Sequence, residues 1–211
     1  MSIKGKEGFT MIQICRTLAL FATVSLPVAA ADLSSLTESC DSCHGADGVS
    51  EWNDMPTIAG IDEFVNSEAL FIYRDNARPC ADSEFRRGDT SQAVTNMCDV
   101  ARNLEDEDIE ALAAHYAALP FVAAAQEFDA DLASAGEAIH ARECGLCHTA
   151  GGSDPADESS ILAGQWKGYL ALSMAEYRSG DRDQPPRMQQ AIDALSDGDV
   201  LALLDYYASQ Q

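Results

Sequence analysis

Basic residues are scarce in this sequence, which has 13 Lys and Arg against 35 Asp and Glu and a formal charge of −22. A field of this sign repels nucleic acid and anionic lipid, so we expect no nucleic-acid partner. The G-x-G-x-x-G fingerprint of a dinucleotide site is also missing. No alternating strand pattern and no βαβ unit is present, and the sequence therefore predicts an all-α fold.

Long apolar stretches are confined to the N-terminus, where residues 17–28 form an apolar run that follows three basic residues. The run is shorter than a typical membrane-spanning helix, and three alanines follow it. We interpret residues 1–31 as a secretory signal peptide that is cleaved near Ala31. The protein is then exported to the periplasm, and we expect no stable membrane span after cleavage. Residues 32–211 keep 10 Lys and Arg against 34 Asp and Glu, a formal charge of −24 that favours basic protein partners.

Six of the seven cysteines follow the signal peptide, in a compartment where disulfides are permitted. Four of the six belong to two Cys-x-x-Cys-His motifs that lie 104 residues apart. The motifs are Cys40-Asp-Ser-Cys43-His44 and Cys144-Gly-Leu-Cys147-His148, and the two other cysteines are Cys80 and Cys98.

The two halves of the chain repeat each other beyond these motifs. The repeat predicts two small domains at 32–122 and 123–211. The first carries a 13-residue insertion between Arg74 and Met97, because the offset between the halves falls from 104 to 91 residues there. The offset of 104 aligns Ile58-Ala59-Gly60 with Leu162-Ala163-Gly164 and Tyr73-Arg74 with Tyr177-Arg178, and the offset of 91 aligns Met97 with Met188 and Tyr116 with Tyr207.

Each half shows the same order of expected elements. A helix leads into the cysteine motif, and a glycine-rich loop follows it. A middle helix comes next, at about 62–76 and 165–179, and then a loop that carries a methionine. A closing helix ends each half, and acidic residues at 105–108 and 196–199 suit its first turn because the helix dipole favours negative charge there.

A Cys-x-x-Cys-His motif suits covalent haem. Two thiols one helical turn apart can reach the two vinyl groups, and the following imidazole can ligate the iron. Thioredoxin-like redox pairs and zinc sites also use Cys-x-x-Cys. Neither explains a histidine directly after both motifs, so we predict two haem c groups. Their cysteines are Cys40, Cys43, Cys144 and Cys147, and their proximal iron ligands are His44 and His148.

The sixth ligand of each iron is predicted to be a methionine, because His/Met ligation raises the potential and fits electron transfer. Of the four methionines after the signal peptide, only Met97 and Met188 are equivalent in the repeat. Met55 and Met174 are interpreted as core residues.

Cys98, next to Met97, is a second candidate ligand, since a thiolate could reach the iron and lower its potential. We favour a disulfide between Cys98 and Cys80, which would tie the insertion to the ligand loop.

Three further residues are candidates for haem contacts. Arg74 and Arg178 recur in the repeat and could pair with haem propionates, or they could be solvated charges at helix ends. Trp166 could cover a haem edge or could be an ordinary core residue. His115 and His140 do not recur, and we expect surface or packing roles for them.

With both motifs and both methionines in place, the chain after the signal peptide resembles the diheme class I cytochromes of the cytochrome c4 kind. This resemblance implies two tandem class I cytochrome c domains related by a pseudo-twofold axis, with His/Met irons. It also implies propionates that face each other across the domain interface.

The second half is similar to the haem subunit of flavocytochrome c sulfide dehydrogenase. The segments that carry this likeness are Ile161-Leu-Ala-Gly-Gln-Trp166 and Tyr207-Ala-Ser-Gln-Gln211. In that family the subunit accepts electrons from a separate flavoprotein, and the insertion in the first half departs from its pattern.

Three functions follow from these features. The first is a periplasmic electron carrier with redox protein partners and no substrate site of its own. The second is the electron-accepting subunit of a sulfide dehydrogenase, with a flavoprotein as partner. The third is a diheme enzyme of the peroxidase or thiosulfate dehydrogenase type, in which one haem is open or ligated by Cys98.

Overall fold

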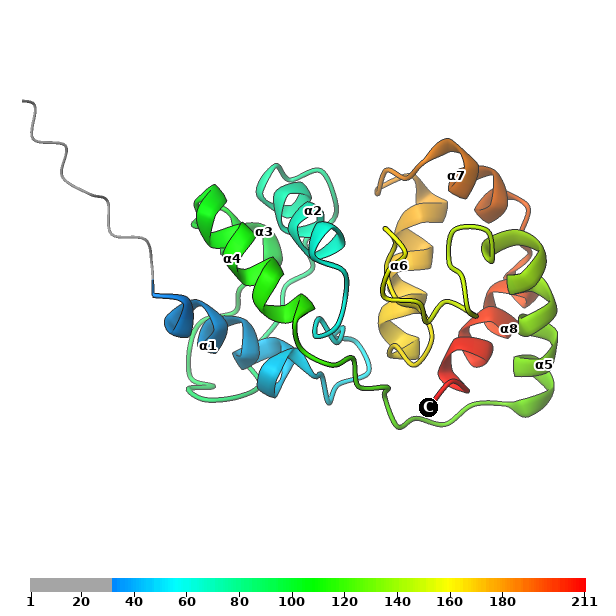
Figure 1. The fold of residues 1–211 in the computed structure, drawn as a ribbon, viewed down its shortest axis with the longest axis horizontal. Helices are drawn as coiled ribbons and strands as arrows, with labels where there is room; N and C mark the ends of the chain where they lie inside the picture. Colours follow the sequence, from blue (N-terminus) through cyan, green and yellow to red (C-terminus); the bar gives the residue numbers. More distant parts are fainter. Residues whose placement is uncertain (1–31) are drawn as a thin grey trace, which may run out of the picture.

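The computed structural model describes residues 32–211, so the predicted signal peptide at 1–31 lies outside the described residues. Figure 1 shows two helical domains joined by a single extended segment. The first contains α1 (Leu33–His44), η1 (Ala46–Gly48), α2 (Glu63–Arg74), α3 (Met97–Ala101) and α4 (Asp106–Ala117). The second contains α5 (Ala130–Ile139), η2 (His140–Cys144), α6 (Lys167–Ser179), α7 (Pro186–Asp193) and α8 (Asp197–Ala208).

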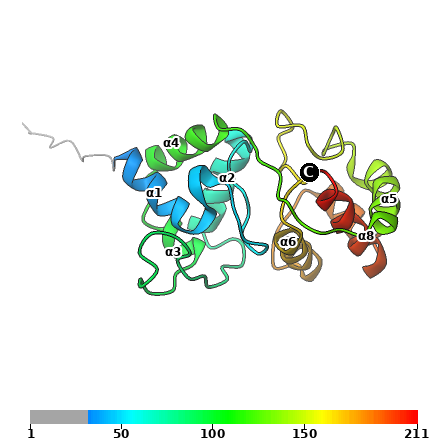
Figure 2. The ribbon, with the colours of Figure 1, turned by 90° about the horizontal axis from the view of Figure 1, so that it is seen from below.

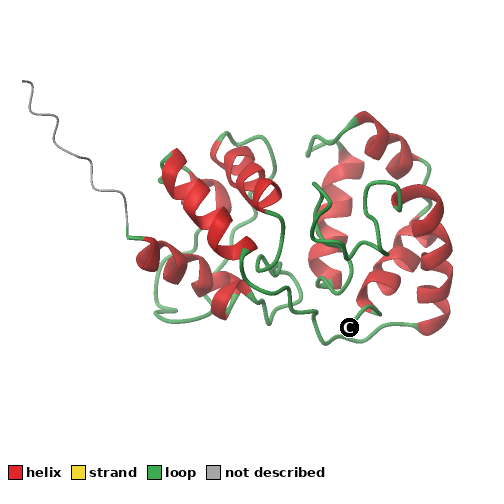
Figure 3. Ribbon diagram, in the orientation of Figure 1, coloured by secondary structure: helices red, strands yellow, loops and turns green. Residues whose placement is uncertain are grey.

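The all-α prediction is confirmed for residues 32–211, where Figure 3 shows helices and loops but no strand. One isolated antiparallel bridge pairs Ser83 with Thr95 inside the insertion. Within these residues, none of the helices combines the length and the apolar character needed to cross a bilayer.

The closing helices begin in the same way in both domains. The Asp199 carboxylate accepts the backbone N–H of Ser196 at 2.9 Å, and the Asp108 carboxylate accepts the backbone N–H of Glu105 at 3.2 Å. These bonds satisfy N–H groups that the first turn of a helix leaves without a partner. The predicted acidic first turns of α4 and α8 are present.

Buried apolar side chains of the closing helices form the centre of each domain. In the first domain Ile109, Leu112 and Tyr116 of α4 are at most 3% exposed. In the second, Leu203 and Tyr207 of α8 pack in a cluster with residues from α5 and α6. Gly136 brings α5 close to α8, since a Cβ atom on it would collide with the backbone of Ala202.

The repeated Ala-Gly segments fasten the loop after each motif to the closing helix. The N–H of Gly60 donates to the carbonyl of Tyr116, and the N–H of Gly164 donates to the carbonyl of Tyr207, both at 2.8 Å. Both glycines have positive φ, and a Cβ atom on either would collide with the linker between the domains. The repeat in the sequence therefore corresponds to a repeated backbone connection.

The two methionines lie on short helices, and the prediction that they lie in loops was wrong. Met97 is the first residue of α3, which starts where the Asn96 side chain accepts the N–H of Asp99 at 2.9 Å. Met188 is the third residue of α7, which starts at Pro186. Helices this short show little periodicity, and the Pro, Gly and Asp residues around them in the sequence favoured the prediction of a loop.

The segment between α4 and α5 crosses from one domain to the other, and the turned view of Figure 2 shows the domains side by side. It runs from Ala118 to Asp129 without helix and includes Pro120. The N–H of Ala124 donates to the carbonyl of Gly164 at 2.7 Å, which ties the linker to the second domain.

Replacing Gly136 by Ala should lower the free energy of unfolding by about 1–3 kcal/mol, because the added methyl group forces α5 away from α8. Gly198→Ala is the matched control. Gly198 lies near the start of α8, where an added Cβ atom would make only an ordinary contact of 3.7 Å with the Ser196 hydroxyl oxygen, and there the change should be neutral or stabilise by up to about 1 kcal/mol. Denaturant unfolding followed by circular dichroism measures both. Equal effects of the two substitutions would show that the α5–α8 approach is not close in solution.

Candidate haem sites

The first motif lies on the last turns of α1. Cys40 and Cys43 stand one helical turn apart, are half-buried, and are not joined to each other or to another cysteine. His44 ends the helix and is 7% exposed. Its Nδ1 lies 3.0 Å from the carbonyl oxygen of Pro56, which can only accept, so Nδ1 carries the proton.

The second motif has the same histidine contact but a different backbone. A turn of π-helix, η2, spans His140–Cys144 and ends at Cys144, and Cys147 lies in the turn that follows; both thiols are free. The Nδ1 of His148 donates to the carbonyl oxygen of Ser160 at 3.2 Å. Ser160 is the repeat equivalent of Pro56, so both imidazoles are oriented by the same backbone position.

The geometry of both histidines fits an iron ligand. Burial lowers the pKa of His44 and of His148, which keeps both rings neutral. With Nδ1 donating to a carbonyl, the lone pair of Nε2 stays available, and a hydrogen bond of this kind is typical of metal-bound histidine. Among residues 32–211 no group of three or more His, Cys, Asp or Glu is arranged to hold a metal ion.

A tyrosine from each closing helix reaches the segment around the motif. Tyr116 donates to the Asp41 carboxylate at 2.9 Å, and this carboxylate also accepts the N–H groups of Asp47 and Gly48. Tyr207 instead pairs with Nδ1 of His140 at 2.9 Å. Burial raises the pKa of both tyrosines, so both phenols stay protonated. The packing role expected for His140 is what the structure shows, since that residue is only 4% exposed.

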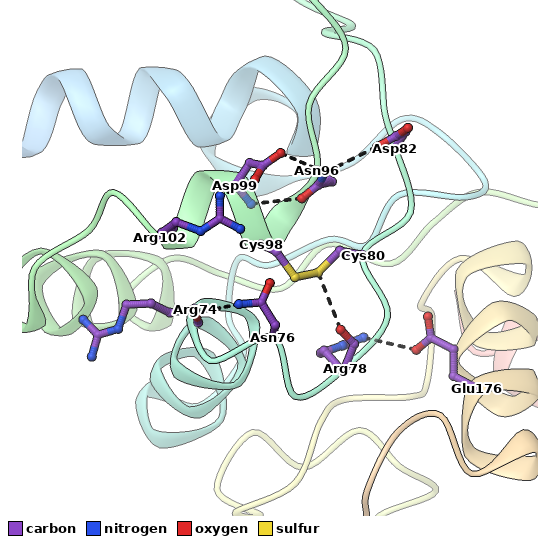
Figure 4. Close-up of a disulfide and its surroundings, with 10 residues drawn as sticks. All are labelled: Arg74, Asn76, Arg78, Cys80, Asp82, Asn96, Cys98, Asp99, Arg102 and Glu176. Carbon is purple, nitrogen blue, oxygen red and sulfur yellow. Dashed lines mark hydrogen bonds and ion pairs between the residues drawn. A yellow bond between two sulfur atoms is a disulfide. The ribbon is translucent and has the colours of Figure 1, made fainter.

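Met97 and Met188 are both half-buried, on α3 and α7 respectively. Met174 packs against the apolar cluster of the second domain, in keeping with a core role. The thiol beside Met97 is not free, because the structure joins Cys98 to Cys80 in a disulfide with a Cα–Cα distance of 5.8 Å. Figure 4 shows this bond between α3 and the inserted segment.

Arg74 and Arg178 each form an ion pair with an aspartate of the protein. Arg74 pairs with Asp106 at 2.7 Å and also donates to the carbonyl of Leu104. Arg178 pairs with the repeat equivalent, Asp197, at 2.7 Å. Both arginines connect a middle helix to the first turn of a closing helix, so we do not propose them as propionate partners.

Trp166 and its neighbour join the two domains. The indole N–H of Trp166 donates to the carbonyl of Ser50 at 2.9 Å. The buried amide of Gln165 accepts the N–H of Thr57 at 3.0 Å and donates to the carbonyl of Thr57 at 2.9 Å. The structure therefore places Trp166 at the domain junction.

A buried polar cluster, which we call the junction cluster, lies between the domains and was missed from the sequence. Its charged members are Arg78, Arg182 and Glu176. Glu176 Oε2 lies 3.6 Å from Arg78 and 3.8 Å from Arg182. The guanidinium groups of Arg78 and Arg182 stack on Tyr73 and Tyr177, each 4.3 Å from the ring centroid. The offset of 104 also aligns Arg78 with Arg182, and that signal could have revealed the pair.

The junction cluster contains buried polar atoms without a hydrogen-bond partner. Within residues 32–211 these atoms are Arg78 Nε, a donor, and Glu176 Oε2, an acceptor. Burial raises the pKa of Tyr73 to about 12, so its phenol remains a further donor. Unsatisfied buried donors are costly, and carboxylates of a bound group would satisfy them. The two arginines of the cluster therefore fit haem propionates at this junction, whereas the Glu176 carboxylate carries the same charge as a propionate.

Comparison with known proteins points to one family. The family model described as cytochrome c matches residues 30–119. The chain is 28% identical over 179 residues to cytochrome c4 of Pseudomonas aeruginosa, which covers 79% of this chain and 81% of that protein.

Two solved structures are similar along most of the chain. Reduced recombinant cytochrome c4 from Pseudomonas stutzeri matches with a TM-score of 0.67 and 24% identity, covering 86% of this chain and all of that one. Thiosulfate dehydrogenase from Marichromatium purpuratum matches with a TM-score of 0.64 and 25% identity, covering 82% of this chain and 36% of that one.

Proposed function

Because this chain is a diheme class I c-type cytochrome of the cytochrome c4 kind, we propose that it is a periplasmic carrier of single electrons between protein partners. Each bound haem supplies one-electron iron chemistry. The observation that carries the proposal is the pair of equivalent motifs, each with two free cysteines and an imidazole fixed through Nδ1.

Four cysteines would hold the haem groups covalently, and two histidines would ligate the irons from one side. Cys40 and Cys43 serve the first domain and Cys144 and Cys147 the second. Burial raises the pKa of Cys40 to about 11 and also raises the pKa of Cys144, so these thiols stay protonated and do not act as thiolate ligands. His44 and His148 offer Nε2 to the metal.

Met97 and Met188 are proposed as the second axial ligands. Support comes from their equivalence in the repeat and from their half-buried positions on equivalent short helices, α3 and α7. A thioether opposite a neutral imidazole raises the reduction potential, and a six-coordinate iron leaves no open position for a substrate. Both consequences suit a carrier.

Arg78 and Arg182 are proposed as the partners of the haem propionates, in place of Arg74 and Arg178. At the domain junction Arg78 is buried and Arg182 is half-buried, and Arg78 Nε has no hydrogen-bond partner there. Fixed positive charge at this place favours the reduced state of a nearby redox centre, because reduction adds a negative charge.

A carrier is favoured over the enzyme alternative. Cys98 was the one feature of the sequence that favoured an enzyme, and it is bonded to Cys80 and therefore not available as a thiolate. The likeness to thiosulfate dehydrogenase covers about a third of that protein. A role as the haem subunit of a sulfide dehydrogenase would require a separate flavoprotein, and the carrier proposal requires only a redox protein partner.

Single substitutions of Met97 or Met188 by Ala should each remove one His/Met site. The weak sulfur-to-iron absorption band of the ferric protein should fall to roughly half in either variant, because one of two sites loses its thioether. Optical and electron paramagnetic resonance spectra measure this. Met55→Ala and Met174→Leu are the controls, and both should keep the full band. A band that keeps its full intensity in Met97→Ala or Met188→Ala, or that falls to half in a control, would contradict the assignment of the ligands.

Arg78→Gln should lower the midpoint potential of at least one haem by about 40 mV, equivalent to about 1 kcal/mol for one electron, because a buried positive charge is lost. Arg74→Gln removes the same charge at a half-buried ion pair with Asp106 and should shift the potential less. Potentiometric titration followed optically compares the two variants. A larger shift of the midpoint potential in Arg74→Gln than in Arg78→Gln would indicate that Arg74 is the propionate partner.

A further inference from the structure

Residues 75–96, the segment of the first domain that contains the 13-residue insertion, lie across the cysteine motif. The backbone N–H groups of Arg86 and Arg87 donate to the carbonyl of Ser42, which is the residue just before Cys43, at 2.9 and 3.0 Å. The sulfur of Cys43 lies 3.9 Å from the carbonyl oxygen of Glu84. The segment therefore contacts the part of the motif where the second thioether would form.

Three attachments hold the segment in this place. The Cys80–Cys98 disulfide fixes one end, and the bridge between Ser83 and Thr95 pairs its two arms. The Arg86 guanidinium binds both carboxylate oxygens of Asp54 at 2.6 and 2.7 Å. This contact holds the pKa of Asp54 below its usual range, so the ion pair is present at neutral pH.

The second domain has no counterpart of this cover. Leu146, the repeat equivalent of Ser42, is 64% exposed, and Cys147 is exposed where Cys43 is half-buried. The loop that joins α6 to α7 runs only from Gly180 to Pro185. A large apolar side chain thus stands in solvent directly beside the second cysteine of the motif.

The rim of this exposed edge is acidic. The loop 149–160 borders it, because Ser159 donates to the carbonyl of Cys147 at 2.7 Å. That loop contains Asp154, Asp157 and Glu158 and no basic residue. The one arginine of the motif segment, Arg142, is paired with Glu143 at 2.6 Å.

From this asymmetry we propose that protein partners dock on the Leu146–Cys147 edge of the second domain, and that segment 75–96 closes the equivalent edge of the first. The partner is a basic redox protein, since an exposed leucine within an acidic rim matches an apolar patch surrounded by lysines. Electron tunnelling weakens steeply with distance, so a layer of polypeptide over the Cys43 edge disfavours exchange with partners there. This inference rests on the proposed carrier function.

Carbodiimide cross-linking tests the docking surface without relying on electron transfer. The diheme protein is mixed with a lysine-rich monohaem c-type cytochrome, and the acidic residues that become linked to its lysines are mapped by mass spectrometry. We expect links at Glu143, Asp154, Asp157 and Glu158. Links centred on Glu84 and Asp89 of the inserted segment, or on Asp54, would overturn the proposal.

A second test of the docking surface introduces a positive charge at the centre of the Leu146–Cys147 edge. Leu146→Lys should lower both the cross-link yield and the second-order rate of electron exchange with the basic cytochrome by about tenfold. Leu201→Lys, at a position on α8 that is 55% exposed, adds the same charge and should change neither by more than about twofold.

The two failures are distinguishable. Equal behaviour of the two lysine variants, with electron exchange intact, would overturn the docking surface and leave the carrier function standing. A haem-loaded protein that exchanges electrons with neither small reagents nor proteins would overturn both.

Discussion

The orientation of two imidazoles by backbone carbonyls is the constraint on which the account of this protein depends. Each histidine must present Nε2 to a metal while the two preceding cysteines face the same group. The carbonyls of Pro56 and Ser160 achieve this by accepting Nδ1–H from His44 and His148. Both carbonyls belong to loops that the Ala-Gly segments tie to the closing helices, so the core of each domain determines the position of its ligand.

The two halves of the chain contain similar sites, but the two sites differ in how the polypeptide covers them. The first site carries the inserted segment, its disulfide and the Arg86–Asp54 ion pair, whereas the second leaves Leu146 in solvent. At the junction the two halves meet again through equivalent arginines, Arg78 and Arg182, which share one carboxylate. The two Cys-x-x-Cys-His motifs thus differ in how much polypeptide covers them, and the two domains share a polar boundary.

Most of the fold could be predicted from the sequence because long, strongly patterned elements determine it. The middle and closing helices lie within a few residues of their expected bounds, and the two-domain all-α architecture is confirmed. The short helices that carry Met97 and Met188 were missed, since five to eight residues give too little periodicity. The junction cluster was missed for another reason. Burial of Arg78 and Glu176 depends on how the domains pack, and no local pattern encodes that.

The covalent attachment of two haem groups is the central claim, and the mass of the intact purified protein tests it most directly. After denaturation, which releases any group that is not covalently held, the polypeptide should retain the mass of two haems in addition to its own mass. Peptide mapping should find one on each Cys-x-x-Cys-His segment. A polypeptide that carries no haem, or only one, would contradict the account.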